Sequence, residues 1–399
     1  MTLYDALYAY VPERLQGPFW RAYYGATPHL GLAIPVTRLC GPVRPHGRPG
    51  TLVVAGRAAW LRPYLADTFF LSAPASEPLA TTTIWGLPGA LRGLAREADA
   101  TLALLDSINA RWSLARDHLR LPTWVDLGRS ATASRAEIFR RNESARSDLR
   151  HIHRAGLKAR LSRDPADLDR YYGDYYVPTT LKRYGQHAFV HSAHFLRDRY
   201  RNGFLLWIEK DREPIAGCLG EVRAGFVKMW SVGLRGGDQQ WAKLGAYGAV
   251  YYFLGQQAHD LGAHAVGFGG CRPFLSDGVL RYKRKWGATL AGRAAMSYDD
   301  LCLGWTHFNS VVADLLDALS VVFLERGRLA ALTCLAAAGP AAARDAERRR
   351  HLMWTPGLGR LYIVGGRGWE ANSTAPPDCE LLRPEDVGSS AVWCARLRG

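Results

Sequence analysis

The alternation of apolar and polar positions is clearest in the middle of the chain. Three apolar runs, at 204–209, 215–222 and 226–232, follow one another with short polar turns between them. Turns this short join antiparallel neighbours, so the runs predict a three-stranded meander. A helical pattern at 246–261 and an apolar strand at 265–268 come next. A helix between two strands indicates a parallel crossover.

Two helices are expected before the meander. Asp164 followed by Pro165 is a capping residue with a proline in the first turn, which predicts a helix start. This helix runs through apolar positions to about Thr180, and a second helix begins at Ser192. The middle of the chain therefore has the order of two helices, three antiparallel strands, a helix and a strand.

Upstream, 121–127 predicts a strand and 134–156 predicts a helix, with Ser134 as N-cap and Gly156 as the C-terminal stop. The helix carries many arginines and histidines. Two interpretations stand side by side: a ridge that faces phosphates, or a solvated helix face.

The flanking patterns are weaker. Segment 51–55 predicts a strand, and 87–109 has apolar residues at helical spacing. Segments 311–326 and 329–350 have a helical pattern, and 361–364 resembles a strand. The expected division is an N-terminal α/β domain at 1–120, a central domain at 121–298, and a helical extension with a small C-terminal module at 299–399.

Composition narrows the class of protein. The chain has 399 residues, 48% of them hydrophobic, and Lys+Arg exceed Asp+Glu by 51 to 36, a formal charge of +15. A surplus of this size favours a polyanionic partner such as tRNA or coenzyme A, although Arg-rich chains of GC-rich genomes are also basic without one. No DNA partner is expected. Neither a signal peptide nor an apolar run of membrane-spanning length is recognised, so a soluble, cytoplasmic protein is expected. Contact with a membrane surface would rest on the apolar helical patterns at 311–343.

One short stretch concentrates candidate chemistry. Residues 268–287 follow the apolar strand, open with Gly269 and Gly270, and then crowd cations among aromatic residues. Paired glycines let the backbone turn sharply or approach a ligand. Rigidly held cations, Arg272 among them, suit an anionic substrate or a developing oxyanion. The alternative is a basic surface helix after a strand.

The stretch resembles a known family. A strand ending in a glycine pair, a loop with Asp-Gly, and then Tyr-Lys-Arg-Lys-Trp-Gly at 282–287 is similar to the end of the catalytic domain in the FemAB-like branch of the GNAT acyltransferase superfamily. The resemblance covers roughly 121–295. It implies a GNAT-like mixed, mainly antiparallel sheet flanked by helices. Because the family often carries a degenerate first copy of its fold, it also implies such a copy at 1–120. The order of elements deduced above is that of the GNAT core.

The resemblance also implies catalytic roles. Lys283 would steady the carbonyl oxygen of the acyl donor, or the tRNA end, and Tyr282 would pack beside it. Asp277 is a candidate acceptor for the proton of the attacking amine. The structural alternative for Asp277 is a turn made with Gly278.

Further positions are expected to bind substrates. The loop that cradles phosphates in acetyl-CoA enzymes corresponds to 241–249. It is degraded here, since Ala242 stands where Arg or Gln is usual and Tyr247 where the second glycine is usual. The substrate-binding set is Trp230, Ser231, Lys243, Gly245, Gly269, Gly270, Arg272, Arg183 and Tyr184. Glu221, on the middle strand, is either a base or a solvated, edge-facing residue, and the second interpretation is preferred.

No metal site and no tightly bound cofactor are expected, because His187, His191 and His194 have no carboxylate or cysteine at ligand spacing. The predicted function is amide formation by attack of an acceptor amine on an activated acyl donor, either acyl-CoA or aminoacyl-tRNA. The acceptor would belong to cell-wall, polysaccharide or peptide natural-product assembly. The alternative is a non-catalytic GNAT-fold module that binds RNA or an anionic surface.

Overall fold

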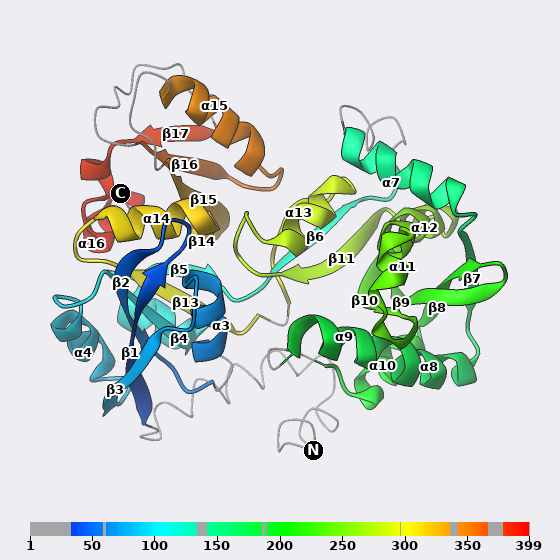
Figure 1. The fold of residues 1–399 in the computed structure, drawn as a ribbon, viewed down its shortest axis with the longest axis horizontal. Coiled ribbons are helices and arrows are strands. Elements are labelled where there is room, and N and C mark those ends of the chain that lie inside the picture. The colour runs from blue at the N-terminus through cyan, green and yellow to red at the C-terminus, as the bar shows by residue number, and fades with distance from the viewer. Residues whose placement is uncertain are drawn as a thin grey trace. The chain divides into compact units, whose positions relative to one another are not determined.

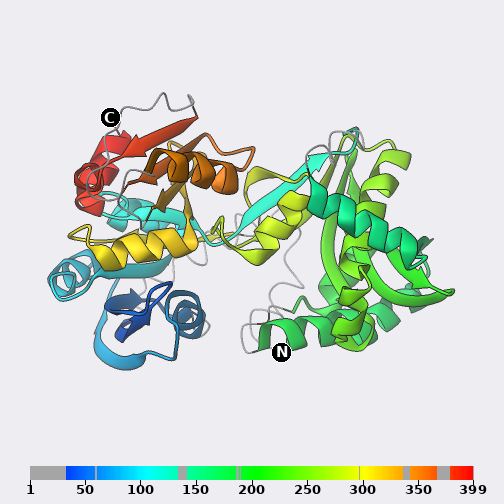
Figure 2. The ribbon, with the colours of Figure 1, turned by 45° about the horizontal axis from the view of Figure 1, so that its top comes forward.

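The computed structural model describes residues 33–58, 61–133, 142–185, 188, 190–295, 297–335, 342–365 and 378–398. These residues form two compact units (Figures 1 and 2). Unit 1 contains 126–270 and 281–291, and unit 2 contains 33–125, 271–280 and 292–398.

Unit 1 is built on a seven-stranded sheet with the order β12-β6-β11-β10-β9-β8-β7. Its strands are β6 (Val125–Ser130), β7 (Lys158–Ser162), β8 (Gly203–Lys210), β9 (Glu213–Arg223), β10 (Phe226–Leu234), β11 (Ala265–Cys271) and β12 (Thr289–Arg293). Its helices are α7 (Glu143–Arg154), α8 (Pro165–Tyr171), α9 (Val177–Tyr184), α10 (Ala193–Tyr200), α11 (Gln239–Lys243), α12 (Ala246–Asp260) and α13 (Gly278–Lys285).

The predicted meander is confirmed. Strands β7 to β10 pair antiparallel in succession, and β10 pairs parallel with β11 after the crossover through α12. The helices that precede β8 also lie where the pattern placed them. The fold class is therefore confirmed: unit 1 is a mixed, mainly antiparallel sheet flanked by helices, with its elements in the order that the resemblance implies.

An aromatic cluster fixes the helices before β8 against the sheet. Trp207 of β8 is fully buried, with the ring of Tyr175 at 4.9 Å and that of Tyr171 at 6.0 Å between centroids. Gly217 of β9 keeps this contact open, because a Cβ there would lie 3.0 Å from the Trp207 ring. The register of the meander is thus tied to the packing of α8 and the π-helical turn that follows it.

Unit 2 contains a six-stranded sheet, β3-β1-β2-β4-β13-β5, and a four-stranded sheet, β14-β15-β16-β17. Its strands are β1 (Ile34–Val43), β2 (Arg48–Ala55), β3 (Ala75–Thr82), β4 (Ala100–Asp106), β5 (Leu119–Pro122), β13 (Asp299–Gly304), β14 (Val321–Glu325), β15 (Arg328–Cys334), β16 (Arg360–Val364) and β17 (Cys379–Leu382). Its helices are α3 (Leu61–Phe69), α4 (Leu87–Leu94), α5 (Ser107–Asn109), α14 (Ser310–Leu319), α15 (Ala342–Met353) and α16 (Ser390–Arg398).

The two ends of the chain share unit 2. Strand β13 pairs with β4 on one side and with β5 on the other, so a strand after residue 298 completes a sheet begun before residue 56. One hydrophobic core joins Phe69 to Trp393. This arrangement differs from the expected three-part division. Pairing between segments so far apart in the sequence leaves no local pattern from which it could be predicted.

Several element predictions need correction. The helical spacing at 87–109 ends at Leu94, and 100–106 is the buried strand β4. The helical patterns at 311–326 and 329–350 contain strands β14 and β15 besides α14 and α15. A continuous run of apolar residues has no period, so a buried strand imitates a buried helix there.

Other element predictions shift only at their ends. The predicted strand at 121–127 is two strands, β5 and β6, divided at 123–124. The basic helix begins at Glu143, with the Asn142 side chain accepting the N–H of Ala145 as its cap. Ser134, the predicted cap, lies outside the described residues. Among the helices of the described chain, none has the length and apolarity required to cross a membrane.

Candidate functional site

The candidate site lies in unit 1, where strands β10 and β11 part. Their pairing register runs from Phe226 with Ala265 to Lys228 with Gly267, although both strands continue beyond it. Just past this point Gly269 has φ of +73°, and a Cβ there would approach the Met229 carbonyl oxygen to 3.2 Å. Glycine is required by both the backbone conformation and the space.

Lys283 stands at this parting of the strands. Its side chain is 4% exposed, and Nζ donates to the carbonyl oxygens of Gly269 at 2.8 Å and Gly270 at 2.9 Å. An ammonium has three N–H donors, and within the described residues the third has no hydrogen-bond partner. No carboxylate pairs with Lys283 in the same part of the chain. The structure thus brings three predicted residues together around a buried positive charge.

Helix α13 carries Lys283, and Asp277 begins it. The Asp277 Oδ1 accepts the N–H groups of Val279 and Leu280, both at 2.9 Å, which is the pattern of an N-terminal cap. Asp277 therefore has a structural role, as the cap of α13 rather than as part of a simple turn with Gly278. Its predicted role as proton acceptor remains a prediction.

Tyr282 lies beside Lys283 on the helix and faces α12. The ring of Tyr251 meets it edge-on at 5.5 Å, and a Cβ at Gly248, in the first turn of α12, would lie 3.4 Å from the Tyr282 hydroxyl. Burial, and then the neighbouring Asp148 carboxylate, raise the pKa of Tyr282 well above its usual value. The hydroxyl is therefore a neutral donor near the start of α12. Lys285 pairs with Asp148 at 2.6 Å.

The start of α12 is a helix terminus without a capping side chain at its N-cap. Gly245 precedes it with φ of +92°, and a Cβ at Gly248 in its first turn would lie 3.5 Å from Asp148 Oδ2. The first backbone N–H groups of a helix bind anions, because they point outward at the positive end of the helix dipole. Lys243, the last residue of α11, is exposed nearby.

Arg183 also reaches the start of α12. Its guanidinium lies 5.3 Å from the ring of Tyr247 and 5.5 Å from that of Tyr184. Tyr247 belongs to the first turn of α12, so the contact places Arg183 near the helix end that Gly245 begins, with Tyr184 beside it. All three were predicted to bind substrate, and that role remains a prediction. Tyr247 and Asp148 are the members that the sequence analysis did not single out for chemistry.

Trp230 and Ser231 are tied into an internal network. Trp230 is the bulged residue of β10, and its Nε1 donates to Glu221 Oε2 at 2.6 Å. Ser231 Oγ accepts the Tyr171 hydroxyl at 3.0 Å. The interpretation of Glu221 as a solvated edge residue is wrong: it is 6% exposed, and Arg199 approaches its other oxygen at 3.9 Å. The apolar environment of β9, read from sequence, already favoured burial.

His191 covers the same network. Its ring stacks on Phe195 at 4.4 Å and stands edge-on to Trp230 at 6.2 Å. Burial, and then the nearby Arg199, lower the pKa of His191 to about 4. His187 lies outside the described residues. Among those that are described, no group of three or more His, Cys, Asp or Glu is placed to hold a metal.

Arg272 belongs to unit 2, where its guanidinium stacks between the rings of Trp124 at 4.1 Å and Tyr64 at 4.4 Å. Burial raises the pKa of Tyr64 to about 12, so that ring stays neutral. Such a stack positions Arg272 rigidly.

Comparison with known proteins adds distant likenesses. No known family's sequence profile matches the chain, and no curated protein matches it by sequence. Among solved structures it is similar to FemX, with 12% identity over 74% of this chain and 94% of that chain, at a TM-score of 0.36. It is also similar to L-PGS from Bacillus licheniformis, with 10% identity over 63% of this chain and 76% of that chain, at a TM-score of 0.33. It is similar as well to a GCN5-related N-acetyltransferase from Sphaerobacter thermophilus, with 14% identity over 63% of this chain and 71% of that chain, at a TM-score of 0.32. Likenesses at these TM-scores assign neither fold nor activity to this chain.

Proposed function

We propose that unit 1 is an acyltransferase that forms an amide. The observation that carries the proposal is Lys283, whose ammonium is buried with two backbone carbonyls and no carboxylate. A buried charge is costly unless a partner neutralises it. A substrate oxygen that gains negative charge during acyl transfer is such a partner, and one donor of this kind contributes about 3–4 kcal/mol to the transition state.

The neighbouring groups fit the parts of this reaction. The donor's acyl group would lie where β10 and β11 part, with its carbonyl oxygen toward the third N–H of Lys283. The donor's phosphates would meet the N-terminus of α12, where the N-cap Gly245 has no capping side chain and Arg183 adds a positive charge. The Tyr282 hydroxyl, kept neutral by its raised pKa, would donate to the same region.

The reaction balances without a cofactor. The acceptor's amine nitrogen attacks the acyl carbon, the bond from that carbon to the leaving sulfur or oxygen breaks, and the amine proton passes to a base. The leaving group is the thiol of coenzyme A or the terminal hydroxyl of tRNA. Both donors are polyanions, which accords with the formal charge of +15.

A titration of the purified chain with acetyl-CoA and with aminoacylated tRNA, at low and moderate salt, tests the proposal. Saturable acetyl-CoA binding that unlabelled coenzyme A competes away identifies an acyl-CoA enzyme. Binding of tRNA that requires the aminoacyl group identifies the other donor. Binding of tRNA that follows ionic strength alone would instead support a non-catalytic module.

A further inference from the structure

A second feature of unit 1 lies at the other end of its sheet. A groove of about 670 Å³ opens beside the start of β8, the end of β9 and the last turn of α12. Because α12 has 15 residues and rises about 1.5 Å per residue, the groove is roughly 22 Å along that helix from the site around Lys283. The volume is that of a site for a small molecule.

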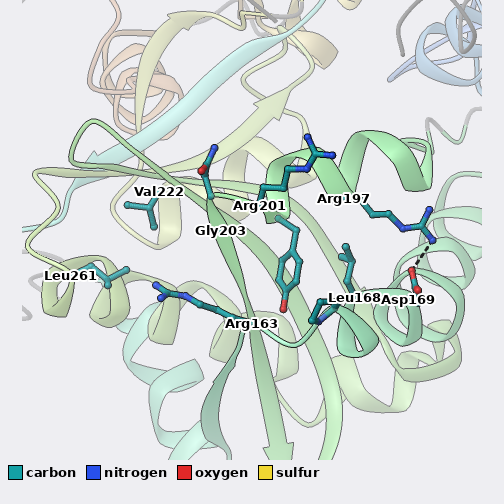
Figure 3. A pocket seen from close by; sticks show the side chains of 11 residues that line it. Arg163, Leu168, Asp169, Arg197, Arg201, Gly203, Val222 and Leu261 are labelled. Carbon is teal, nitrogen blue, oxygen red and sulfur yellow. Dashed lines mark hydrogen bonds and ion pairs between the residues drawn. The ribbon is translucent and has the colours of Figure 1, made fainter. Parts of the chain in front are cut away.

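The floor of the groove is apolar. Leu168 is 4% exposed, Tyr200 is 9% exposed, and the Tyr200 hydroxyl is turned to the backbone oxygen of Asp164 at 3.0 Å. Leu261, at the end of α12, is 39% exposed, although leucine in this position could have packed inside. Val222 lines the same side (Figure 3). These side chains offer an aliphatic ligand a surface that water covers poorly.

The rim of the groove is cationic. Three arginines and one aspartate line it, and the aspartate, Asp169, is paired with Arg197 at 2.8 Å. Arg163 has no ion-pair partner among the described residues, and in Figure 3 it extends toward the side where Leu261 and Val222 lie. Arg201 makes only a 3.4 Å contact with exposed Asp198. Three positive charges against one negative leave a surplus of two in the groove.

We propose that this groove binds a phosphate that carries an aliphatic chain. Planar guanidinium groups recognise phosphate oxygens through paired hydrogen bonds, which a single point charge does not offer. The apolar floor takes the chain, and Arg163, which extends toward Leu261 in Figure 3, takes the phosphate. This site is separate from the proposed acyltransferase site and does not rest on it.

Calorimetric titration with hexyl phosphate tests the proposal. Saturable binding with a dissociation constant of about 1 mM or tighter is expected, and inorganic phosphate should bind several-fold more weakly because it lacks the chain. Equal affinity for the two probes would overturn the apolar half of the site. No saturable binding of hexyl phosphate would overturn the proposal altogether.

Four variants separate the contributions. R163Q is expected to weaken hexyl phosphate binding about tenfold. R201Q removes a guanidinium group that points away from Leu261 in Figure 3, and it should weaken binding only about twofold to threefold. L261Q should weaken hexyl phosphate about threefold and leave inorganic phosphate unchanged. R212Q removes the same charge from the exposed β8–β9 turn, at the opposite end of β8, and should change affinity less than twofold. An R212Q effect as large as that of R163Q would show that only net charge matters, which contradicts the site.

Two further arms locate the ligand and its source. A Lys283→Met variant should bind hexyl phosphate as tightly as the natural chain, and a loss there would place the ligand at the other site and overturn the proposal. Vesicles with and without phosphatidylglycerol distinguish the sources. Retention on the anionic vesicles that R163Q abolishes identifies a lipid headgroup, whereas hexyl phosphate binding without retention identifies a free aliphatic phosphate.

Discussion

Each unit contains a buried charged side chain, and the two side chains differ in the kind of partner that surrounds them. In unit 2 the carboxylate of Asp300 is fully buried between two guanidinium groups. Arg120 donates to its Oδ2 at 2.6 Å and 2.9 Å, and Arg293 pairs with Oδ1. In unit 1 the ammonium of Lys283 is almost as deeply buried, yet the described residues meet it with two neutral backbone oxygens and no carboxylate.

We propose that the difference is one between a structural charge and a functional one. The charge of Asp300 is countered by charged side chains of the chain itself. Among the described residues, Lys283 is met by backbone dipoles and by no carboxylate. A fold keeps such a charge at a cost, and substrate binding is the ordinary reason for keeping it.

Removing the carboxylate in unit 2 is expected to have the largest effect. Asp300→Asn keeps the shape but leaves two largely buried guanidinium groups without their counter-charge. The free energy of unfolding should fall by about 3–5 kcal/mol, measured by urea denaturation. Asp211→Asn breaks an exposed pair with Lys210 and should cost at most about 0.5 kcal/mol. Similar losses in the two variants would mean that burial does not distinguish these pairs.

A second carboxylate near Asp300 gives unit 2 a dependence on pH. Burial, and then the adjacent Asp106 carboxylate, raise the pKa of Asp299 to about 7. Its value in the unfolded chain is about 3.9. The folded chain therefore holds this proton more tightly, and the stability it contributes is lost as pH rises from about 4 to about 7.

Asp299→Asn should remove that part of the pH dependence. The variant is expected to be more stable than the natural chain at pH 8, with the gain shrinking toward pH 4. Urea unfolding at several pH values measures it. Parallel curves for the two proteins would show that Asp299 titrates normally.

Lys283→Met should affect stability much less than Asp300→Asn does. The change removes a buried charge, which favours folding, but leaves two glycine carbonyls without a donor, which opposes it. We expect the free energy of unfolding to change by no more than about 1 kcal/mol. A loss of about 3 kcal/mol or more would mark Lys283 as a structural residue like Asp300, and the contrast between the units would fail.

A small effect is also expected at Lys285, two residues after Lys283 in α13. Its pair with Asp148 is partly exposed, at 18% and 28% of the two side chains. Lys285→Met should cost less than about 1 kcal/mol in urea unfolding. A larger loss of unfolding free energy would show that the Lys285–Asp148 pair contributes more to the stability of α13 than an exposed pair does.

Local patterns were sufficient for unit 1 and insufficient for unit 2. The meander and crossover are visible because short turns and a single helix join strands that are neighbours in the sheet. In unit 2 the sheet closes with β13, whose partners β4 and β5 lie nearly 200 residues earlier. The strongly apolar sequence of β4 has no period that separates strand from helix.

The candidate site divides in the same way. Lys283, Tyr282 and the glycine pair are close in sequence, so their association could be predicted from one motif. Asp148 approaches α13, and Tyr247 meets Arg183, only through packing, and no spacing rule predicts either contact. Glu221 was misjudged because its partners, the half-buried Trp230 and the buried Arg199, come from a bulge in β10 and from helix α10.

The central claim is that Lys283 acts on the acyl group of a donor. The most direct measurement compares acetyl-CoA with free coenzyme A, and aminoacylated with uncharged tRNA, in titrations of the natural chain and of Lys283→Met. The account predicts that the variant binds the acylated member of one pair about tenfold more weakly and the bare member equally well. The account would be contradicted if the variant bound both members of a pair equally more weakly. It would also be contradicted if the variant bound all four ligands as tightly as the natural chain does.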